Sequence, residues 1–397
     1  MEIPVFIVVP RSENPTLDLT VVMRAFEGGG AQRDMILLCN ALAAKGLRIH
    51  IVALKPQGSL RDLIDPAIAI SAVPGRQMRY AIPGLRRLIG ALAPRSVISS
   101  EAALNLCTLI AVRSLPRRDR PKLILREVGS PSIAERNDPY RQNRIAYRIL
   151  RRVYRFADRI VTLTEGARDD LTKNFGVSAK SIAVMLTNAV VTQDVTEQLE
   201  QWDGESGREN DLIVCIGRLS PEKDQATLIR AVALLPAALP WRLAMVGDGA
   251  ERANLETLAR KLGIADRVIF AGHVADPFPW MRRARVAVCS SVYEGLCNAI
   301  IEALACGTPV VSTDCPYGPV EILQRGRYGT LIPIGDAAAM AAALEAALLE
   351  VQDRAALMAR GRNYTAARAA DRFLEILAEL QPAPAARPFG AAVQEAI

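Results

Sequence analysis

The sequence predicts an α/β protein of two domains, each built on a parallel β-sheet. Its 397 residues are too many for one ordinary hydrophobic core. Short runs of β-branched residues alternate with helical patterns, and this alternation is typical of parallel α/β layers. Two such series occur, separated at residues 192–210 by a polar stretch without periodic apolar positions.

The first series contains five expected strands and one clear helix. The helix lies in the segment MILLCNALAAKG, which is apolar on one face and ends at Gly46, a residue suited to the position just after a helix. The expected strands are residues 5–9, 48–53, 96–99, 123–126 and 159–163.

The second series has the same alternation, with a helical segment after each strand. We therefore expect an N-terminal domain over residues 1–191, a linker over 192–210 and a C-terminal domain over 211–362. A helix over 363–380 is expected to cross back to the first domain, and the Pro- and Ala-rich residues 381–397 to form a disordered tail. The expected strands of the second series are residues 212–216, 241–246, 268–271, 286–289 and 309–312.

The composition excludes some classes of protein, and the charge distribution suggests a kind of partner. Half of the residues are hydrophobic and 23% are charged, which excludes a disordered or fibrous chain. Residues 1–190 carry 29 Lys and Arg against 16 Asp and Glu, a net charge of +13, whereas the remainder carries −6. The Arg-rich stretch 76–159 favours an anionic partner for this half, with an ordinary solvated surface as the alternative.

The sequence also indicates a cytoplasmic protein. The opening MEIPVFIVVPRSE has no basic region and no cleavage site of a signal peptide. No run approaches the roughly 18 apolar residues of a membrane-spanning helix, so any membrane contact is expected to be peripheral, at the inner face. The cysteines form no C-x-x-C pair, so they suggest neither a zinc site nor a disulfide framework. They are Cys39, Cys107, Cys215, Cys289, Cys297, Cys306 and Cys315.

Two cations follow the first strand of the second series, in VCIGRLSPEKDQATL. Gly217 and Arg218 come directly after the strand, and Lys223 precedes a helix. Ligands of open α/β sheets bind at the carboxyl ends of strands, and an Arg fork with a mobile Lys suits a diphosphate. A solvated loop with ordinary charges is the alternative. The next strand ends in a Gly247-Asp248-Gly249 turn, which a simple tight turn also explains.

The segment CSSVYEGLCNAIIEALACG carries two acids at the start of a helix. Glu294 lies in the loop before the helix and Glu302 lies eight positions later, so both carboxylates can face one cleft. The helix N-terminus between them offers free N–H groups to a phosphate, and Gly295 allows close approach of a ligand. Paired carboxylates also occur in glycoside hydrolases, but a hydrolase has no need of a cationic diphosphate site. Simple helix capping by the acids is the other alternative.

These motifs resemble the donor-binding half of retaining glycosyltransferases of family GT4. The resemblance is carried by GRLSPEKD, GDGAER, YEGLCNAIIEALACG and PVVSTDCPYGPVEIL, in this order over residues 212–336. The first half adds EGGGAQRDMILLCNALAAKGLRIHIV, VTLTEGARDDLTKNFG and TNAVV, similar to the glycine loop and domain end of the same family. The resemblance implies the GT-B architecture, in which two Rossmann-like domains face each other across a cleft.

The resemblance also implies a role for each motif residue. Arg218 and Lys223 would bind the donor diphosphate, Glu302 the ribose hydroxyls, and Glu294 the hydroxyls of the transferred sugar. Arg218, Lys223 and Glu294 are thus the candidate catalytic residues, and Gly29 and Gly30 would form the loop that approaches the reacting centre. The remaining candidate donor-binding residues are Gly217, Gly295, Leu296, Cys297 and Asn298.

One departure from the family concerns the acceptor side. Many relatives carry a histidine near the reacting sugar, but the corresponding stretch SVISSEAALNLC has none. His50 lies inside a strand pattern and is expected to be an ordinary strand residue. Glu101 in that stretch, or Glu127 after the next strand, could face the cleft, and either could equally be a surface acid.

The resulting hypothesis is a hexosyl- or N-acetylhexosaminyltransferase that works with retention, without a metal or other cofactor. A UDP-sugar is the expected donor, with a GDP-sugar second, and the acceptor is a glycan or a lipid-linked glycan. Nucleic acid is not an expected partner. The alternatives are an epimerase or phosphorylase on the same fold, or a non-catalytic donor-binding subunit. An anionic membrane surface is a further expected partner, contacted through residues 81–95, unless these form a buried core helix.

Overall fold

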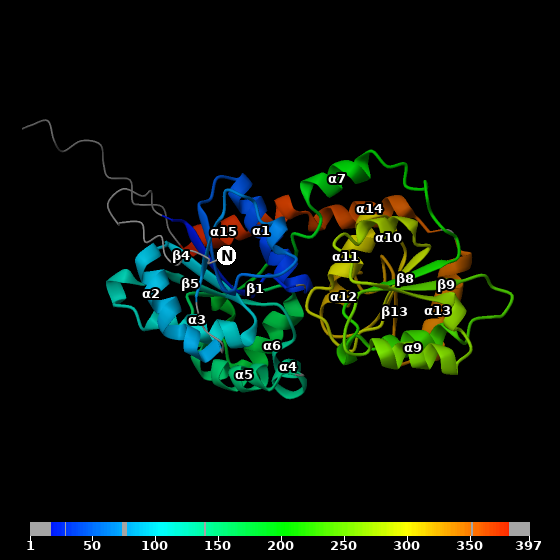
Figure 1. Cartoon of the computed structure of the whole chain (residues 1–397), viewed down its shortest axis with the longest axis horizontal. Coiled ribbons are helices and arrows are strands. Elements are labelled where there is room, and N and C mark those ends of the chain that lie inside the picture. Colours follow the sequence, from blue (N-terminus) through cyan, green and yellow to red (C-terminus); the bar gives the residue numbers. More distant parts are fainter. Residues whose placement is uncertain (1–16, 28, 74–77, 139, 351, 381–397) are drawn as a thin grey trace, which may run out of the picture.

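The computed structural model describes residues 17–27, 29–73, 78–138, 140–350 and 352–380. Two α/β domains lie side by side, and each is built on one parallel sheet surrounded by helices (Figure 1). The predicted fold class, with two parallel-sheet domains, is therefore confirmed.

The N-terminal sheet has the strand order β3-β2-β1-β4-β5-β6-β7, and all of its neighbouring strands pair in parallel. The order reverses direction between β1 and β4, as in doubly wound folds. The strands are β1 Leu19–Ala25, β2 Ile49–Lys55, β3 Ala69–Ala72, β4 Ser96–Ser100, β5 Lys122–Glu127, β6 Arg159–Thr162 and β7 Ile182–Val184.

The C-terminal sheet repeats this arrangement in the order β10-β9-β8-β11-β12-β13, again parallel throughout. Here the reversal lies between β8 and β11. The strands are β8 Leu212–Ile216, β9 Arg242–Val246, β10 Val268–Gly272, β11 Val286–Cys289, β12 Val310–Thr313 and β13 Thr330–Ile332.

Helices connect the strands in both domains, as parallel pairing requires. In the N-terminal part they are α1 Gly30–Ala44, α2 Ile82–Leu92, α3 Ala102–Arg113, α4 Pro131–Asn137, α5 Arg141–Val153 and α6 Glu165–Phe175. From residue 193 onward they are α7 Gln193–Glu200, α8 Gln225–Val232, α9 Arg252–Lys261, α10 Phe278–Arg283, α11 Asn298–Ala305, α12 Gly318–Ile322, α13 Ala337–Leu349, α14 Arg354–Gly361 and α15 Ala366–Leu380.

Nine of the ten expected strands occur within two residues of their predicted bounds. The tenth, at residues 5–9, lies outside the described residues, and the first observed strand of the chain is β1. Four strands had no counterpart in the prediction: β1, β3, β7 and β13. The last three have only three or four residues each, too few for a periodic pattern to stand out.

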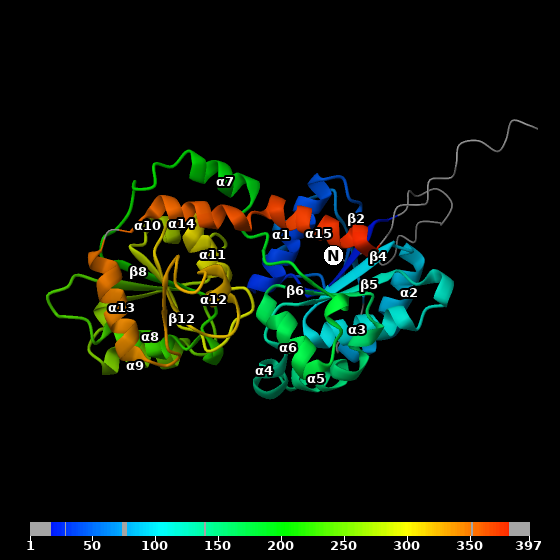
Figure 2. The same cartoon turned by 180° about the vertical axis from the view of Figure 1, so that it is seen from behind.

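The end of the chain returns to the N-terminal domain. Helix α14 lies against the C-terminal domain and α15 continues onto the N-terminal domain, beside α1 (Figures 1 and 2). The crossing is fixed by a parallel bridge between Val191 and Thr365. Lys45 at the end of α1 forms an ion pair of 2.8 Å with Asp371 of α15. Thus the chain passes twice between the domains, which limits how far they can separate.

Candidate active site

The strand order of each sheet reverses direction once, and the predicted loops lie at these two reversals. In the C-terminal sheet β8 and β11 are neighbours, so the loop containing Gly217 and Arg218 lies beside the loop that contains Glu294. Connections from neighbouring strands leave a crevice at such a reversal, and ligands of open α/β sheets bind there. In the N-terminal domain, the glycine loop after β1 opens at the corresponding reversal.

A cleft of about 610 Å³ lies between the domains at this point. Every residue that the sequence analysis placed in the donor site lines it, together with several that it did not name. The predicted lining residues are Gly29, Gly30, Gly217, Arg218, Lys223, Glu294, Gly295, Leu296, Cys297, Asn298 and Glu302. Residues not predicted include Arg33, Asp34, Asn188 and His273.

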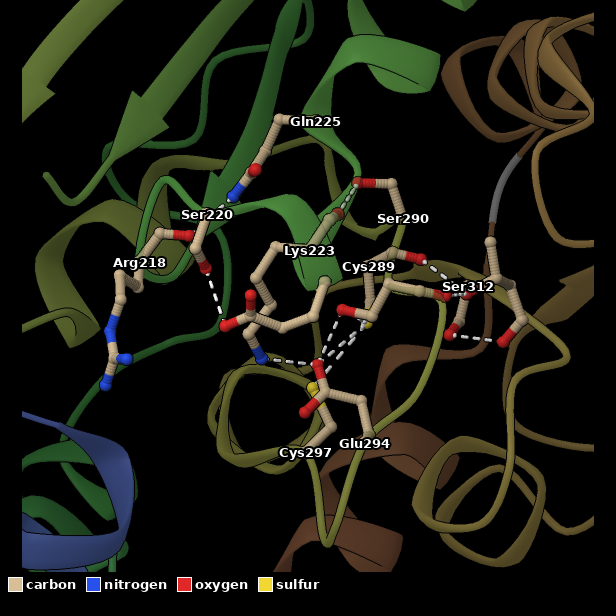
Figure 3. Close-up of polar contacts among 12 residues, drawn as sticks. Arg218, Ser220, Lys223, Gln225, Cys289, Ser290, Glu294, Cys297 and Ser312 are labelled. Carbon is tan, nitrogen blue, oxygen red and sulfur yellow. Dashed lines mark hydrogen bonds and ion pairs between the residues drawn. The ribbon is translucent and has the colours of Figure 1, made fainter. Parts of the chain in front are cut away.

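Lys223 and Glu294 form the polar centre of the C-terminal wall (Figure 3). The Lys223 Nζ lies 2.5 Å from Glu294 Oε1, and the Ser291 hydroxyl donates to the same oxygen at 2.6 Å. Burial by itself would raise the pKa of Glu294, but the Lys223 ammonium and these hydrogen bonds outweigh it and hold that pKa below its usual value. The same carboxylate raises the pKa of Lys223, against the opposing effect of burial. Both side chains are therefore charged at neutral pH.

Arg218 supplies a second positive charge to the cleft. Its side chain is exposed and extends toward the N-terminal domain (Figure 3). A Cβ atom added to Gly29 would lie 3.2 Å from its Nη2, so the guanidinium reaches the glycine loop across the cleft. Since Lys223 lines the same cleft, both cations face a space that is open to a ligand.

Helix α11 begins in the cleft wall. Its N-cap residue Cys297 accepts no hydrogen bond with its side chain, so the first N–H groups of the helix are not capped by it. Asn298 and Ala299, the first two helical residues, line the cleft. The positive end of the helix dipole therefore points into the same space as the two cations.

Glu302 contacts a residue of the other domain. Its Oε1 accepts a charged hydrogen bond of 2.7 Å from Arg33 Nη1, at the start of α1. The Glu302 side chain is only 4% exposed. Burial raises its pKa to about 7, although Arg33 acts to lower it. The prediction did not name Arg33, yet it lies three residues after Gly30 in the quoted glycine-loop motif.

Asn298 makes two further contacts across the cleft. It donates to the Gly30 carbonyl at 3.2 Å, and its side chain carbonyl accepts from Asn188 at 2.5 Å. Asn188 in turn accepts from Arg126, which is buried and paired with Asp34. A series of hydrogen bonds therefore runs from the core of the N-terminal domain to helix α11 in the wall of the cleft.

The glycines allow close approach of the two domains. A Cβ atom on Gly295 would lie 1.9 Å from the Val128 carbonyl oxygen, so no larger residue fits between the domains there. The Ser130 hydroxyl nearby donates to the Glu294 carbonyl at 3.0 Å. Gly247 has a φ of +144°, and a Cβ there would lie 1.9 Å from the Gly217 carbonyl oxygen, which explains the glycines of this turn.

The two acids considered for the acceptor side, Glu101 and Glu127, differ in their position and in their contacts. Glu127 lies in the N-terminal core, where it accepts hydrogen bonds from Tyr147, Tyr154 and Asn105. It is therefore neither a surface acid nor a cleft residue. Glu101 follows β4 with a φ of +74° and accepts a hydrogen bond from Gln32 at the start of α1. Burial raises its pKa, while the positive charges of Arg24 and Arg218 and the hydrogen bond from Gln32 act to lower it.

The histidine expectation is confirmed for His50. Its Nε2 lies 2.8 Å from the Ser71 hydroxyl on the neighbouring strand β3, so it is a hydrogen-bonded strand residue. His273 lines the cleft instead. Within the part of the chain that the structure describes, no helix is long and apolar enough to cross a bilayer.

Comparison with known proteins assigns the family. The model of glycosyltransferase family 4 matches residues 28–187, and that of glycosyl transferases group 1 matches residues 210–350. A lipopolysaccharide core biosynthesis glycosyltransferase, LpsE of Rhizobium meliloti, is 30% identical over 363 residues, which cover 88% of this chain and 96% of LpsE. The chain belongs to glycosyltransferase family 4.

A further relative of this glycosyltransferase agrees with the family, and a solved structure shows the same fold. An N-acetylgalactosaminyltransferase of Campylobacter jejuni that acts on a diphospho-undecaprenol-linked glycan is 27% identical, with 89% of this chain and 96% of that enzyme covered. The solved structure of Anabaena Alr3699/HepE in complex with UDP-glucose superimposes with a TM-score of 0.73 at 18% identity, covering 91% and 99% of the two chains. The protein is thus a glycosyltransferase of glycan biosynthesis with the GT-B fold.

Proposed function

We propose that this glycosyltransferase moves a sugar from a UDP-sugar to a hydroxyl of a glycan or lipid-linked glycan, with retention of the anomeric configuration. The observation that carries the proposal is the convergence of Arg218, Lys223 and the N-terminus of α11 on one cleft that also holds Glu294 and Glu302. Cations and helix N–H groups suit a diphosphate, and carboxylates suit the hydroxyls of ribose and sugar.

The reaction as proposed depends on charge that develops on the leaving diphosphate. As the bond between sugar and phosphate oxygen breaks, negative charge grows on the diphosphate, and groups already pointing at that position stabilise the transition state. Arg218 provides a two-pronged contact and Lys223 a point charge. We assign the main catalytic contribution to these groups and expect no metal or other cofactor.

Glu294 and Glu302 have different parts in this proposal. Glu302 would accept hydrogen bonds from the ribose hydroxyls, in place of or beside its bond to Arg33. Glu294 would contact hydroxyls of the transferred sugar, with the backbone of residues 295–298 assisting. Because Lys223 and Ser291 hold the Glu294 carboxylate in position, it is oriented before the donor arrives.

We propose a lipid-linked acceptor because of the surface of helix α5. Arg141, Arg148 and Arg152 lie on one exposed face of this helix with Ile145 and Ile149, which are 44% and 43% exposed. Apolar side chains between basic ones are the pattern of a helix that lies on an anionic bilayer. Phe156 and Tyr140, at either end of α5, are exposed as well.

Helix α2, within the segment 81–95 that the sequence analysis considered for lipid contact, fits this role less well. Leu85 and Ile89 are fully buried in the N-terminal core, which leaves mainly Arg86 and Arg87 on the exposed side. The structure thus favours the core-helix alternative for this segment. Helix α5 lies beside α4, whose N-terminal neighbour Ser130 contacts the cleft residue Glu294 (Figure 1). A bilayer held by α5 would therefore lie near the cleft.

A donor screen followed by a transfer assay tests the proposed function. Binding of UDP-glucose, UDP-N-acetylglucosamine, UDP-galactose, GDP-mannose and free UDP is measured by thermal shift and calorimetry. Stabilisation by UDP-sugars above GDP-mannose is expected, since tighter binding to the native state raises the melting temperature. Transfer is then measured to lipid diphosphate-linked acceptors, and NMR of the product anomeric centre reports retention. Preference for GDP-mannose, or an inverted product, would refute the corresponding part of the proposal.

A further inference from the structure

Two thiols lie directly beneath the Lys223–Glu294 pair. Cys289 ends strand β11 and Cys297 is the N-cap of α11, and both are buried. Their Sγ atoms are 3.7 Å apart, and Cys289 Sγ is also 3.7 Å from Glu294 Oε1 (Figure 3). Side-chain ligand atoms of Cys289, Cys297 and Glu294 all lie within 4.8 Å of one another.

This spacing matches the coordination geometry of a soft divalent metal. Zinc bonded to two thiolates at about 2.3 Å in a tetrahedron separates the sulfur atoms by about 3.8 Å. The observed separation of 3.7 Å therefore needs little rearrangement of the two side chains. A carboxylate oxygen is a third suitable ligand, and three protein ligands with one open position are usual for a zinc site that is accessible to small molecules.

The site is accessible from the cleft. Glu294 and Cys297 both line the cleft wall, so an ion can enter without opening the domain core. Burial raises the pKa of the Cys215 and Cys315 thiols, and the nearby Cys289 and Glu294 raise it further, so two more sulfur atoms lie close to the site. The spacing of Cys289 and Cys297 does not predict such a site, because the two thiols are eight positions apart and come together only through the loop between β11 and α11.

We propose that Cys289, Cys297 and Glu294 form an inhibitory site for a soft divalent metal ion such as zinc. Binding releases the two thiol protons to solvent, and the resulting thiolates and the Glu294 carboxylate coordinate the ion. The Lys223 ammonium must then leave Glu294 Oε1, which it now contacts at 2.5 Å. The two charges of the ion offset the two protons released, so the net charge of the site is unchanged, but the carboxylate is withdrawn from the cleft.

The consequence for catalysis rests on the proposed function. With Glu294 bound to the ion, its carboxylate is no longer free for the donor sugar, and Lys223 loses the partner that orients it. Zinc would therefore inhibit transfer, and a chelator would restore it. This role is compatible with a reaction that needs no metal.

Metal binding by the purified full-length chain, without donor or acceptor, tests the site independently of transferase activity. Equilibrium dialysis against zinc should give one tightly bound ion, and its binding should release about two protons. Cys289→Ala and Cys297→Ala should each weaken binding at least about tenfold. Cys39→Ala is the matched control, because Cys39 is a buried thiol in the N-terminal domain, and it should bind zinc like the wild type.

Cobalt provides a second measurement on the unmodified protein, in case an alanine variant fails to fold. Thiolate ligation of cobalt produces a sulfur-to-metal charge-transfer band in the near ultraviolet, which should appear at one equivalent. Circular dichroism checks the fold of each variant. Absence of the band at saturating cobalt, or equal zinc affinity of the wild type and the Cys289→Ala/Cys297→Ala double variant, would overturn the proposed metal site. Neither result would bear on donor transfer itself.

Discussion

Arg33 Nη1 and Glu302 Oε1 lie 2.7 Å apart across the interdomain cleft, although 269 positions separate the two residues in the sequence. The carboxylate that we assign to the ribose is thus already paired with a cation of the other domain. Burial raises the pKa of Glu302 to about 7, and Arg33 is the main group that opposes this increase. In the proposed function, donor binding and domain contact therefore involve the same titratable group.

This relationship predicts a pH-dependent donor affinity. Only the ionised Glu302 can accept both ribose hydroxyls, so affinity for an intact UDP-sugar should be full above about pH 8 and fall as the pH drops through 7. The diphosphate of an intact UDP-sugar keeps a constant charge over this range, whereas the terminal phosphate of free UDP loses a second proton at about pH 6. Calorimetry with UDP-glucose between pH 5.5 and 9 measures the effect.

Two variants distinguish this explanation from a general effect of acid. Arg33→Gln removes the group that lowers the pKa of Glu302, so the midpoint of the profile should move to higher pH. Glu302→Gln should bind weakly at every pH and show no midpoint near 7. A wild-type profile that stays flat from pH 6 to 8 would remove Glu302 from the donor site.

Arg218→Ala should weaken binding of UDP but hardly change binding of uridine. A charge-assisted contact to phosphate contributes about 1.5–3 kcal/mol, which corresponds to roughly a 10- to 150-fold change in Kd. Calorimetry with both ligands measures the difference, and Arg230→Ala, an exposed arginine on α8, is the matched control. Equal losses for uridine and UDP would place Arg218 outside the phosphate site.

The sequence was sufficient to predict which loops meet, and the reason is topological. Arg218 and Glu294 each follow a strand, and in a parallel sheet the carboxyl ends of strands share one edge, so strand recognition alone brings them together. The contacts of Arg33 and Asn188 with the opposite domain could not be predicted, because they depend on how the two domains dock. Glu101 and Glu127 have the same local signal, an acid at the end of a strand. They differ only through packing within the N-terminal domain, where Glu127 is buried in the core and Glu101 pairs with Gln32.

Gly295→Ala should separate the domains without unfolding either one. Its Cβ would lie 1.9 Å from the Val128 carbonyl oxygen, and a backbone atom cannot move aside as a flexible side chain can. Overpacking of this kind costs about 1–3 kcal/mol. Here that cost reduces the stability of the arrangement in which the two domains are closed on each other. Transfer should therefore fall roughly 5- to 150-fold, while small-angle scattering shows a larger radius of gyration. Gly176→Ala, where a Cβ has open space but φ is +64°, tests for a merely local effect. Unchanged transfer by Gly295→Ala would show that closure at this point is not required.

Transfer should continue in the presence of EDTA. In the proposed mechanism Arg218, Lys223 and the N–H groups of α11 stabilise the leaving diphosphate, so removal of divalent ions takes nothing from the site. Initial rates are compared before and after dialysis against EDTA, with a manganese titration afterwards. Complete loss of activity that manganese restores would contradict the mechanism. A modest gain after EDTA would instead agree with relief of zinc inhibition at Cys289 and Cys297.

Reversing two charges on α5 should reduce binding to anionic vesicles. Arg148 and Arg152 are exposed on the same face as Ile145 and Ile149, and each basic residue near an anionic leaflet contributes about 1 kcal/mol. Arg148→Glu/Arg152→Glu should therefore bind phosphatidylglycerol vesicles at least about 30-fold more weakly, with donor affinity unchanged. The attraction should also weaken with added salt, since exposed charges are screened within a Debye length of about 8–10 Å. Cosedimentation at low and high salt measures both effects.

Arg86→Glu/Arg87→Glu on α2 is the matched control for this experiment, because it changes the charge equally on a helix whose apolar side is buried. Substituting Ile145 and Ile149 by Ser should weaken vesicle binding even at high salt, where only the apolar contact remains. If the apolar face instead joins two copies of the chain, the Ser variant should dissociate a dimer in light scattering without changing vesicle binding. If the α2 and α5 charge variants lose vesicle binding equally, net charge alone attracts the protein to the bilayer. If the wild type binds neutral vesicles as strongly as anionic ones, the proposed role of α5 is excluded.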